Sequence, residues 1–313
     1  MLARRLRVTT GARAVSTLAR LPGLDGELAV ESMVYSNAGA RAPWVVCFHS
    51  SGLGARQWAA GPQLAPGANW IAVNFCGYAG SSPWPREQRA PSLADQASLA
   101  CAAIDHVVPD RARLFVLGHS YGGSIALASC ARLAATRDVA ALVLFEPNCF
   151  FLLPHEQRAA FADEVRGWLE LARAGDEGGF MSRFYAFWFG AGAWEVMPSR
   201  TRAKLRETLR DLDLELVATL AEMESADGAV LSSAAINGAL RACRKHAMCG
   251  TLGTHALTLQ LLERLRTHAG FELHETSALG AGHLAPFTHA GVVLREMLTL
   301  AGAPLAPEDA TGV

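Results

Sequence analysis

The sequence predicts an α/β protein built on a doubly wound, mostly parallel sheet. Four short runs, at residues 44–48, 69–75, 114–117 and 139–145, are apolar almost throughout, which is typical of strands covered on both faces. Helical or turn-rich stretches separate these runs. Strands that alternate with helices in this rhythm favour parallel pairing, because a parallel strand needs a crossover connection.

The length and composition fit one large domain that carries an insertion. Of the 313 residues, 51% are hydrophobic, which is enough for a substantial core. The formal net charge is −1 and the charges are interspersed, so neither nucleic acid nor an anionic membrane surface is indicated as a partner. The chain has no run of about 18 apolar residues, so we expect no membrane span. The oligomeric state stays open.

The cysteines and histidines show no pattern of a metal site. The seven cysteines are an odd number without C-x-x-C spacing, and the ten histidines contain no H-x-x-x-H. Several cysteines lie in apolar patterns, where a free thiol behaves as a small hydrophobe. We therefore expect a reducing, cytoplasmic location, and neither a metal nor another cofactor.

Residues 1–24 contain five arginines and no acidic residue. This composition favours a loose basic arm that precedes the core. A mitochondrial presequence is the alternative, because such segments are rich in Arg and poor in acids.

The first part of the core consists of strands and polar loops. Residues 27–35 alternate in polarity and predict an antiparallel edge strand. The strand at 44–48 leads into residues 49–54, a Gly-rich loop in which backbone N–H groups can turn toward a site. Ser92, with Asp95 three positions later, predicts a capping box for a helix that ends near residue 107.

Ser120 lies in a tight turn between a buried strand and a helix. The strand 114–117 leads to Gly118-His119-Ser120-Tyr121-Gly122, and residues 124–133 have the small, apolar character of a packed helix. This turn fits G-x-S-x-G, in which the glycines remove Cβ atoms that would clash beside a strained nucleophile. The helix points its first N–H groups at the seryl oxygen. The alternative is an ordinary Gly-rich turn.

Residues 148–245 interrupt the strand-and-helix rhythm and predict an α-helical insertion, a cap after the strand that Glu146 closes. Charged residues such as those of 202–215 predict solvent-exposed helix faces. Aromatic residues cluster in the insertion and are candidates for lining a substrate pocket, although they could equally form its own core. The pocket candidates are Phe150, Phe184, Trp188 and Trp194.

Residues 246–313 return to the core pattern, so the core comprises 25–147 and 246–313. Residues 248–252 predict a weak strand, 257–267 a helix, 271–276 a strand and 291–300 an amphipathic helix. Between the last two lies Gly280-Ala-Gly-His283. Of the ten histidines, only His283 lies in a glycine-flanked loop just past a late strand.

Together these motifs resemble the α/β-hydrolase-fold serine hydrolases, from about residue 27 to 302. The likeness rests on five features in the family's order: the His49 loop, the stretch 74–81, the Ser120 turn, Leu-Phe-Glu-Pro at 144–147, and the His283 loop. The resemblance implies Ser120 as nucleophile and His283 as general base. It implies the backbone N–H groups of Tyr121 and Ser51 as oxyanion hole. Ser50 departs from the family's commoner glycine.

The acid of the expected triad is not where most of the family carries it, in the loop after strand seven. Residues 228–262 contain neither Asp nor Glu. Glu146 closes the preceding strand at the edge where ligand loops of parallel sheets gather. Certain haloalkane dehalogenases resemble this arrangement. Glu146 is therefore the expected acid; the alternatives are a capping role for Glu146, or a Ser120–His283 dyad without an acid.

The resemblance implies an enzyme, a carboxylesterase-like hydrolase. It would cleave an ester, thioester or amide of a small to medium apolar molecule through an acyl-enzyme on Ser120. Carbon–carbon bond hydrolysis or a lyase reaction on the same residues is the first alternative. A non-catalytic ligand-binding homologue is the second, and the absent strand-seven acid is its support. The sequence does not identify the physiological substrate.

Overall fold

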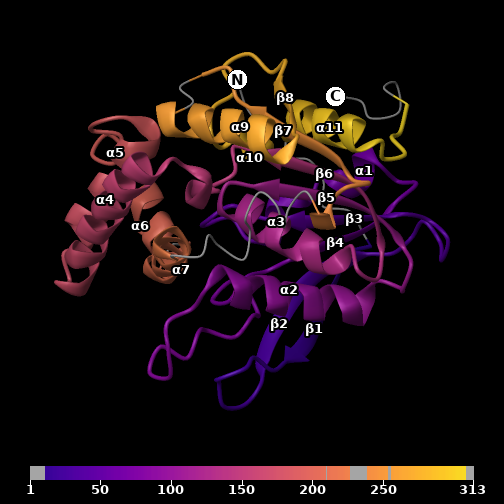
Figure 1. Ribbon diagram of the computed structural model, residues 1–313, viewed down its shortest axis with the longest axis horizontal. Helices are drawn as coiled ribbons and strands as arrows, with labels where there is room; N and C mark the ends of the chain where they lie inside the picture. Colours follow the sequence, from indigo (N-terminus) through magenta and orange to yellow (C-terminus); the bar gives the residue numbers. More distant parts are fainter. Residues whose placement is uncertain (1–10, 209, 226–237, 253–254, 308–313) are drawn as a thin grey trace.

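A computed structural model describes residues 11–208, 210–225, 238–252 and 255–307. Eight strands form one sheet in the order β1-β2-β4-β3-β5-β6-β7-β8 (Figure 1). β1 and β2 pair antiparallel to each other and β2 to β4, and the other neighbours pair parallel. The strands are Arg13–Ala19, Leu28–Tyr35, Trp44–Phe48, Asn69–Val73, Arg113–His119, Asp138–Phe145, Arg244–Cys249 and Glu272–Glu275. The predicted fold class is confirmed.

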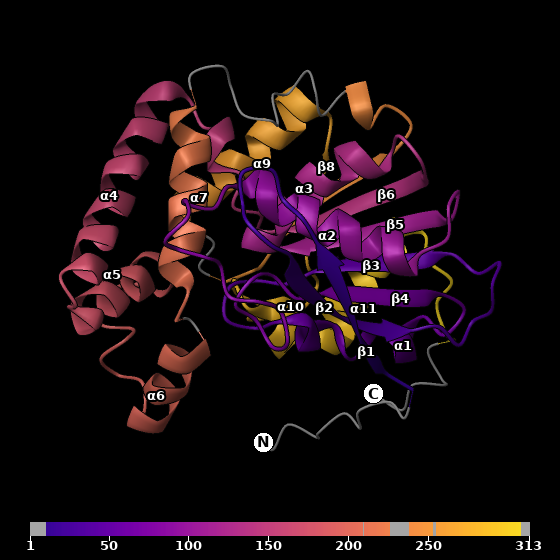
Figure 2. The same cartoon turned by 90° about the horizontal axis from the view of Figure 1, so that it is seen from below.

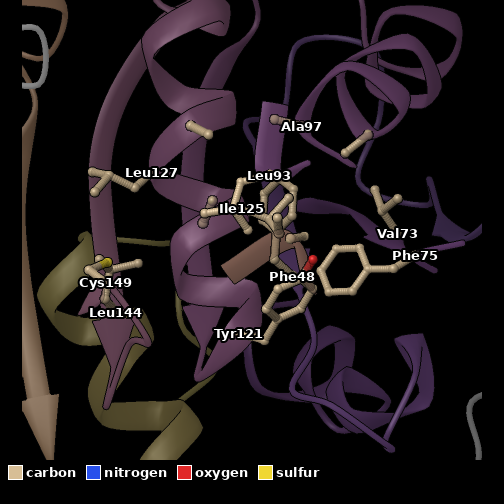
Figure 3. Close-up of a cluster of buried hydrophobic side chains, with 14 of the residues drawn as sticks. Phe48, Val73, Phe75, Leu93, Ala97, Tyr121, Ile125, Leu127, Leu144 and Cys149 are labelled. Atoms are coloured by element: carbon tan, nitrogen blue, oxygen red, sulfur yellow. The ribbon is translucent and has the colours of Figure 1, made fainter. Parts of the chain in front are cut away.

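Apolar cores lie on both faces of the sheet, which explains the continuous apolar runs of its central strands. Every residue of β3 and β4 is buried. One core joins the sheet to α2 (Leu93–Val107), α3 (Tyr121–Leu133) and α9 (Ala256–Ala269). Figure 3 shows part of it around Phe48 and Ile125. The other joins it to α1 (Gly61–Leu64) and α11 (Ala290–Ala301) (Figure 2).

Two further short helices of the core are η1 (Ala55–Trp58) and α10 (Ala285–Thr288). α2 begins with the predicted capping box: Ser92 Oγ accepts from the Asp95 N–H, and the Asp95 carboxylate accepts from the Ser92 N–H at 2.9 Å. Local sequence therefore sets this helix start.

The basic arm is shorter than the sequence suggests, because Arg13–Ala19 form β1. This strand pairs with β2 over its whole length. Only Thr17 and Ala19 of it are buried, and Leu18 points outward with 64% of its surface exposed. Because the inward residues are small and a leucine is exposed, the sequence shows almost no alternation of apolar and polar residues here. The strand was therefore not predicted. The first ten residues of the expected arm lie outside the described residues.

The helical insertion lies between β6 and β7. It comprises η2 (Phe150–Leu152), α4 (His155–Arg173), α5 (Glu177–Phe189), α6 (Ser199–Thr208) and α7 (Leu212–Glu224). Figure 1 shows these helices grouped beside one end of the sheet. Residues 226–237 of the predicted insertion lie outside the described residues. β7 begins four residues before the predicted strand 248–252, because its first half, Arg-Lys-His, is polar.

None of the described helices has both the length and the apolar character needed to cross a bilayer. All seven cysteines are free thiols, and six of them are buried.

We expect that deleting residues 1–20 destabilises the protein more than deleting residues 1–10 does. The longer deletion removes β1, its hydrogen bonds to β2 and the burial of Thr17 and Ala19. The loss should be at least about 2 kcal/mol in the free energy of unfolding, measured by urea titration. Equal unfolding midpoints for the two truncated chains would contradict the role of β1.

Candidate active site

Ser120 lies at the junction of β5 and α3 in a strained backbone conformation. Its φ of 55° and ψ of −123° are unusual for a residue with a Cβ. Two hydrogen bonds hold it there: the Ser120 N–H donates to the Phe145 carbonyl at 3.0 Å, and the Asn148 N–H donates to the Ser120 carbonyl at 3.0 Å. The turn is thus clamped between the ends of neighbouring strands, and Ser120 is 3% exposed.

The flanking glycines are required by close backbone approach. A Cβ on Gly122 would lie 2.3 Å from the His49 carbonyl oxygen and 2.5 Å from that of Phe48. A Cβ on Gly118 would lie 2.9 Å from the Cα of Gly123. All three separations are shorter than van der Waals contact, so the G-x-S-x-G spacing has the steric origin that the sequence suggested.

Ser120, His283 and Glu146 form a hydrogen-bonded chain. The Ser120 Oγ lies 3.0 Å from the His283 Nε2, and the His283 Nδ1 lies 2.8 Å from the Glu146 Oε2. In the neutral tautomer that fits both contacts, Nδ1–H donates to the carboxylate and Nε2 accepts from the hydroxyl. This arrangement can pass the serine proton to the ring while the carboxylate faces the opposite nitrogen.

The segment without carboxylates, residues 228–262, contributes one backbone donor and one backbone acceptor to Glu146. The Gly250 N–H donates to the Glu146 Oε1 at 2.9 Å, and the Glu146 N–H donates to the Met248 carbonyl at 2.9 Å. Gly250 itself has no room for a Cβ, which would lie 2.3 Å from the Ala281 carbonyl oxygen. Glu146 has a φ of 39°, so its backbone is strained as that of Ser120 is.

His119 supports the backbone of His283. Its Nε2 donates to the His283 carbonyl at 2.7 Å, which leaves Nδ1 to accept from the Gln57 side chain at 3.0 Å. Burial lowers the pKa of His119 well below the ordinary value of 6.5. It is therefore a neutral residue that supports the backbone of His283.

His49 supports the loop after β3. Its Nδ1 donates to the Ser50 carbonyl at 2.8 Å and its Nε2 accepts from the Phe75 N–H at 3.2 Å. Burial lowers the pKa of His49 to about 4. The neutral ring thus ties the ends of two neighbouring strands together.

The candidate oxyanion donors, the N–H groups of Tyr121 and Ser51, belong to residues that line the same pocket as Ser120. Tyr121 is the first residue of α3, where a helical N–H has no intrahelical acceptor. The backbone of Ser50 is not in the region that favours glycine: in this loop the positive φ values, 77° and 66°, fall on Gly52 and Gly54. Serine is therefore compatible with this position.

The pocket above Ser120 is walled mainly by the insertion. Side chains of α4, α5 and α7 line it together with Ser120 and His283. Of the predicted pocket residues, Phe150, Phe184 and Trp188 line it. Trp188 stacks on the His283 ring, with centroids 4.4 Å apart and planes 18° from parallel. This stacking keeps water from one face of the imidazole.

The comparisons with known proteins agree with this fold. A family model described as the alpha/beta hydrolase family matches residues 45–296, which is most of the chain.

The chain belongs to the alpha/beta hydrolase family.

Solved structures of low sequence identity share the fold of this alpha/beta hydrolase family member. A variant of a haloalkane dehalogenase from Agrobacterium tumefaciens has a TM-score of 0.62 at 16% identity, covering 94% of this chain and 98% of that one. An esterase from Exiguobacterium antarcticum has a TM-score of 0.62 at 17% identity, covering 91% of this chain and 98% of that one. An enol-lactonase from Burkholderia xenovorans has a TM-score of 0.56 at 19% identity, covering 91% of this chain and 98% of that one. No curated protein sequence gives a significant match.

One predicted pocket residue lies elsewhere. Trp194 is not among the pocket-lining residues. Its ring packs 5.1 Å from that of Tyr185, with the Arg206 guanidinium 5.3 Å from its centroid. Trp194 follows α5 and is buried against it, so aromatic composition alone could not separate pocket wall from packing within the insertion.

The sequence analysis missed Glu215, which it placed on a charged, exposed helix face. Glu215 is 6% exposed and lines the pocket from α7. Its Oε1 accepts from the Tyr78 hydroxyl at 2.6 Å, and its Oε2 accepts from the Ser51 hydroxyl. Burial raises the pKa of Glu215 to about 7. Its spacing from Leu212, Leu216 and Thr219 was the available signal, because these buried residues share one helical face.

Potential metal ligands meet away from this pocket, in a cluster of the described residues that linear motifs could not reveal. On β7 and β8 the His246 Nδ1 lies 3.1 Å from the His274 Nε2 and 3.4 Å from the Glu272 Oε2. None of the three lines the pocket above Ser120. The Glu272 side chain is 74% exposed.

Glu215 should make stability depend on pH. Its pKa is about 7 in the folded chain against an ordinary 4.5. Between these two values the folded chain keeps a proton that the unfolded chain loses, so stability falls as pH rises, by on the order of 3 kcal/mol in total. Below and above this window the contribution is constant. Denaturant titrations from about pH 4 to about pH 8 should show that the free energy of unfolding of Glu215→Gln rises relative to that of wild type across this window. A difference between the two free energies that does not change with pH would contradict this.

Proposed function

We propose that this protein is a serine hydrolase that cleaves an ester, thioester or amide through an acyl-enzyme on Ser120. The observation that carries the proposal is the chain of hydrogen bonds from Ser120 through His283 to Glu146, at 3.0 and 2.8 Å, at the base of a largely apolar pocket. The family membership and the fold support it.

In the proposed first half-reaction, the Ser120 Oγ attacks the substrate carbonyl while its proton moves to the His283 Nε2. The Glu146 carboxylate stabilises the imidazolium that forms. The N–H groups of Tyr121 and Ser51 bind the developing oxyanion. The imidazolium then gives its proton to the leaving alcohol, thiol or amine, which departs as the carbon–oxygen, carbon–sulfur or carbon–nitrogen bond breaks.

In the second half-reaction a water molecule gives a proton to His283 and attacks the acyl carbon. The bond to Ser120 then breaks, and the proton returns to its Oγ. The acid product leaves and the three residues regain their starting states. Apart from the substrate, every step uses groups of this chain and one water molecule.

The helical insertion between β6 and β7 acts as a cap in this proposal. α4, α5 and α7 supply most of the apolar wall, including Phe161, Trp168 and Trp188. An apolar wall excludes water from the acyl-enzyme and strengthens the electrostatic interactions around the oxyanion. The wall favours a small to medium substrate with an apolar part.

Two features weigh against other uses of the same fold. Displacement of a halide by an enzyme carboxylate would need an aspartate at position 120, where this chain has serine. A non-catalytic homologue drew its support from the missing strand-seven acid, and the contact between Glu146 and His283 removes that support.

Ser120→Ala should abolish hydrolysis of p-nitrophenyl esters and labelling by a fluorophosphonate probe, because the attacking oxygen is gone. Ser129→Ala is the matched control: Ser129 lies on α3, is buried, and its hydroxyl has no partner among the described residues. Retained turnover within about tenfold of wild type in Ser120→Ala would refute the proposed mechanism.

Glu146→Gln should lower kcat by up to about 10⁴-fold while KM changes little, because the amide keeps the shape but cannot stabilise the imidazolium. Steady-state kinetics with a p-nitrophenyl ester would measure both constants. Circular dichroism should show an unchanged fold. A kcat close to wild type would assign the acid role to another group or to none.

A further inference from the structure

The pocket contains one buried carboxyl group that the proposed mechanism does not use. Glu215 lies on α7, in the insertion, and reaches the loop after β3 in the core. Its two oxygens accept from the hydroxyls of Tyr78 and Ser51. The other α7 residues that line the pocket are Leu212, Leu216 and Thr219.

Glu215 lies close to the place where the substrate carbonyl would bind. Ser51 offers its backbone N–H to the oxyanion and its hydroxyl to Glu215, and only its Cα and Cβ separate these two donors. The Tyr78 hydroxyl accepts from the Gly52 N–H at 2.9 Å. The carboxyl group is therefore connected by hydrogen bonds to two consecutive residues of the candidate oxyanion loop: directly to the Ser51 hydroxyl, and through the Tyr78 hydroxyl to the Gly52 N–H.

The carboxyl group retains capacity for a further donor. Two carboxylate oxygens offer about four acceptor positions, and the two hydroxyls occupy two of them. When a substrate fills the pocket, water leaves, and an acceptor left without a donor in apolar surroundings costs free energy. A substrate that brings its own donor avoids that cost, whereas a purely apolar substrate incurs it.

Attachment of the insertion to the core does not by itself account for Glu215. The Arg86 guanidinium already joins the two parts at the surface, at 2.9 Å from Asp211 and 2.6 Å from Asp213. A buried carboxyl group is a costly way to add to that attachment, since burial, the largest cause, raises its pKa to about 7. Its place in the pocket wall indicates a role in binding.

We propose that Glu215 forms a polar subsite that selects acyl substrates with a hydroxyl or amino group on the carbon α or β to the scissile carbonyl. This inference rests on the proposed serine hydrolase function and narrows its substrate class. The substrate remains largely apolar, with one hydrogen-bond donor placed next to the reacting carbon.

The test compares esters that differ only at this donor. Hydrolysis of p-nitrophenyl 3-hydroxybutanoate is measured against p-nitrophenyl 3-methylbutanoate, in which a methyl group replaces the hydroxyl, and the 2-hydroxypropanoate ester against the 2-methylpropanoate ester. The 3-aminobutanoate ester is the amino arm. The ratio of kcat/KM within a pair, measured on one enzyme, cancels any general loss of activity.

Wild type should prefer the donor-bearing ester of at least one pair by roughly tenfold or more. Glu215→Met keeps the length of the side chain without its acceptors, so the preference should vanish or reverse. Glu215→Gln keeps a carbonyl acceptor but no charge. It should retain most of the preference for a hydroxyl and lose that for an ammonium, which separates the two donors.

Glu222→Met is the matched control. Glu222 is also buried on α7, with 8% of its surface exposed, but it is not among the pocket-lining residues. The substrate ratio of Glu222→Met should equal that of wild type. If Glu215→Met does not fold, wild type and Glu215→Gln still decide through the 3-aminobutanoate ester, because Gln has nearly the shape of Glu but should lose the preference for an ammonium.

The outcomes separate this inference from the function on which it rests. A wild-type ratio near one in every pair, or a ratio that Glu215→Met leaves unchanged, overturns the subsite even if a fluorophosphonate labels Ser120. Absence of both labelling and ester hydrolysis in wild type overturns the serine hydrolase proposal itself. A lower melting temperature of Glu215→Met with unchanged ratios would show that Glu215 only joins the insertion to the core.

Discussion

The Glu146 carboxylate is the group around which the candidate site is arranged. It is 1% exposed, and a charge buried to that extent is tolerated only with hydrogen-bond donors on its oxygens. Those donors, the Gly250 N–H and the His283 Nδ1–H, come from the loops after β7 and β8. Satisfying one buried charge therefore places two loops, and through His283 it sets the hydrogen bond to Ser120. The positive φ of Glu146 is the local strain that this arrangement sustains.

The surroundings of His49, His119 and His283 determine the role of each ring. His49 and His119 are fully buried without a carboxylate partner, so burial lowers the pKa of each and keeps the rings neutral. As neutral rings, each donates one hydrogen bond and accepts another, which joins loops of different strands. His283, in contrast, has a carboxylate on one nitrogen and a hydroxyl on the other. The sequence motif places His119 beside Ser120, but its contacts make it a support for His283.

The aromatic residues of the insertion both line the pocket and form the insertion's own core. Phe161 and Trp168 pack against each other, with centroids 5.9 Å apart, and also line the pocket above Ser120. The ring of Phe187 packs against both of them and against Trp188, which stacks on the ring of His283. Glu215 adds a carboxyl group to the insertion's wall, and its hydrogen bonds to Tyr78 and Ser51 connect that wall to the oxyanion loop.

The sequence by itself determined the central strands, the turn around Ser120 and the capping box of Ser92, because each depends on residues within a few positions of one another. The tertiary structure alone decided the rest. β1 has too few buried residues to show a period and is held by its pairing with β2. Glu146 and His283 are 137 residues apart, so their contact depends on the order of strands in the sheet. The burial of Glu215 depends on how α7 packs against the core, which the charges of its own helix do not reveal.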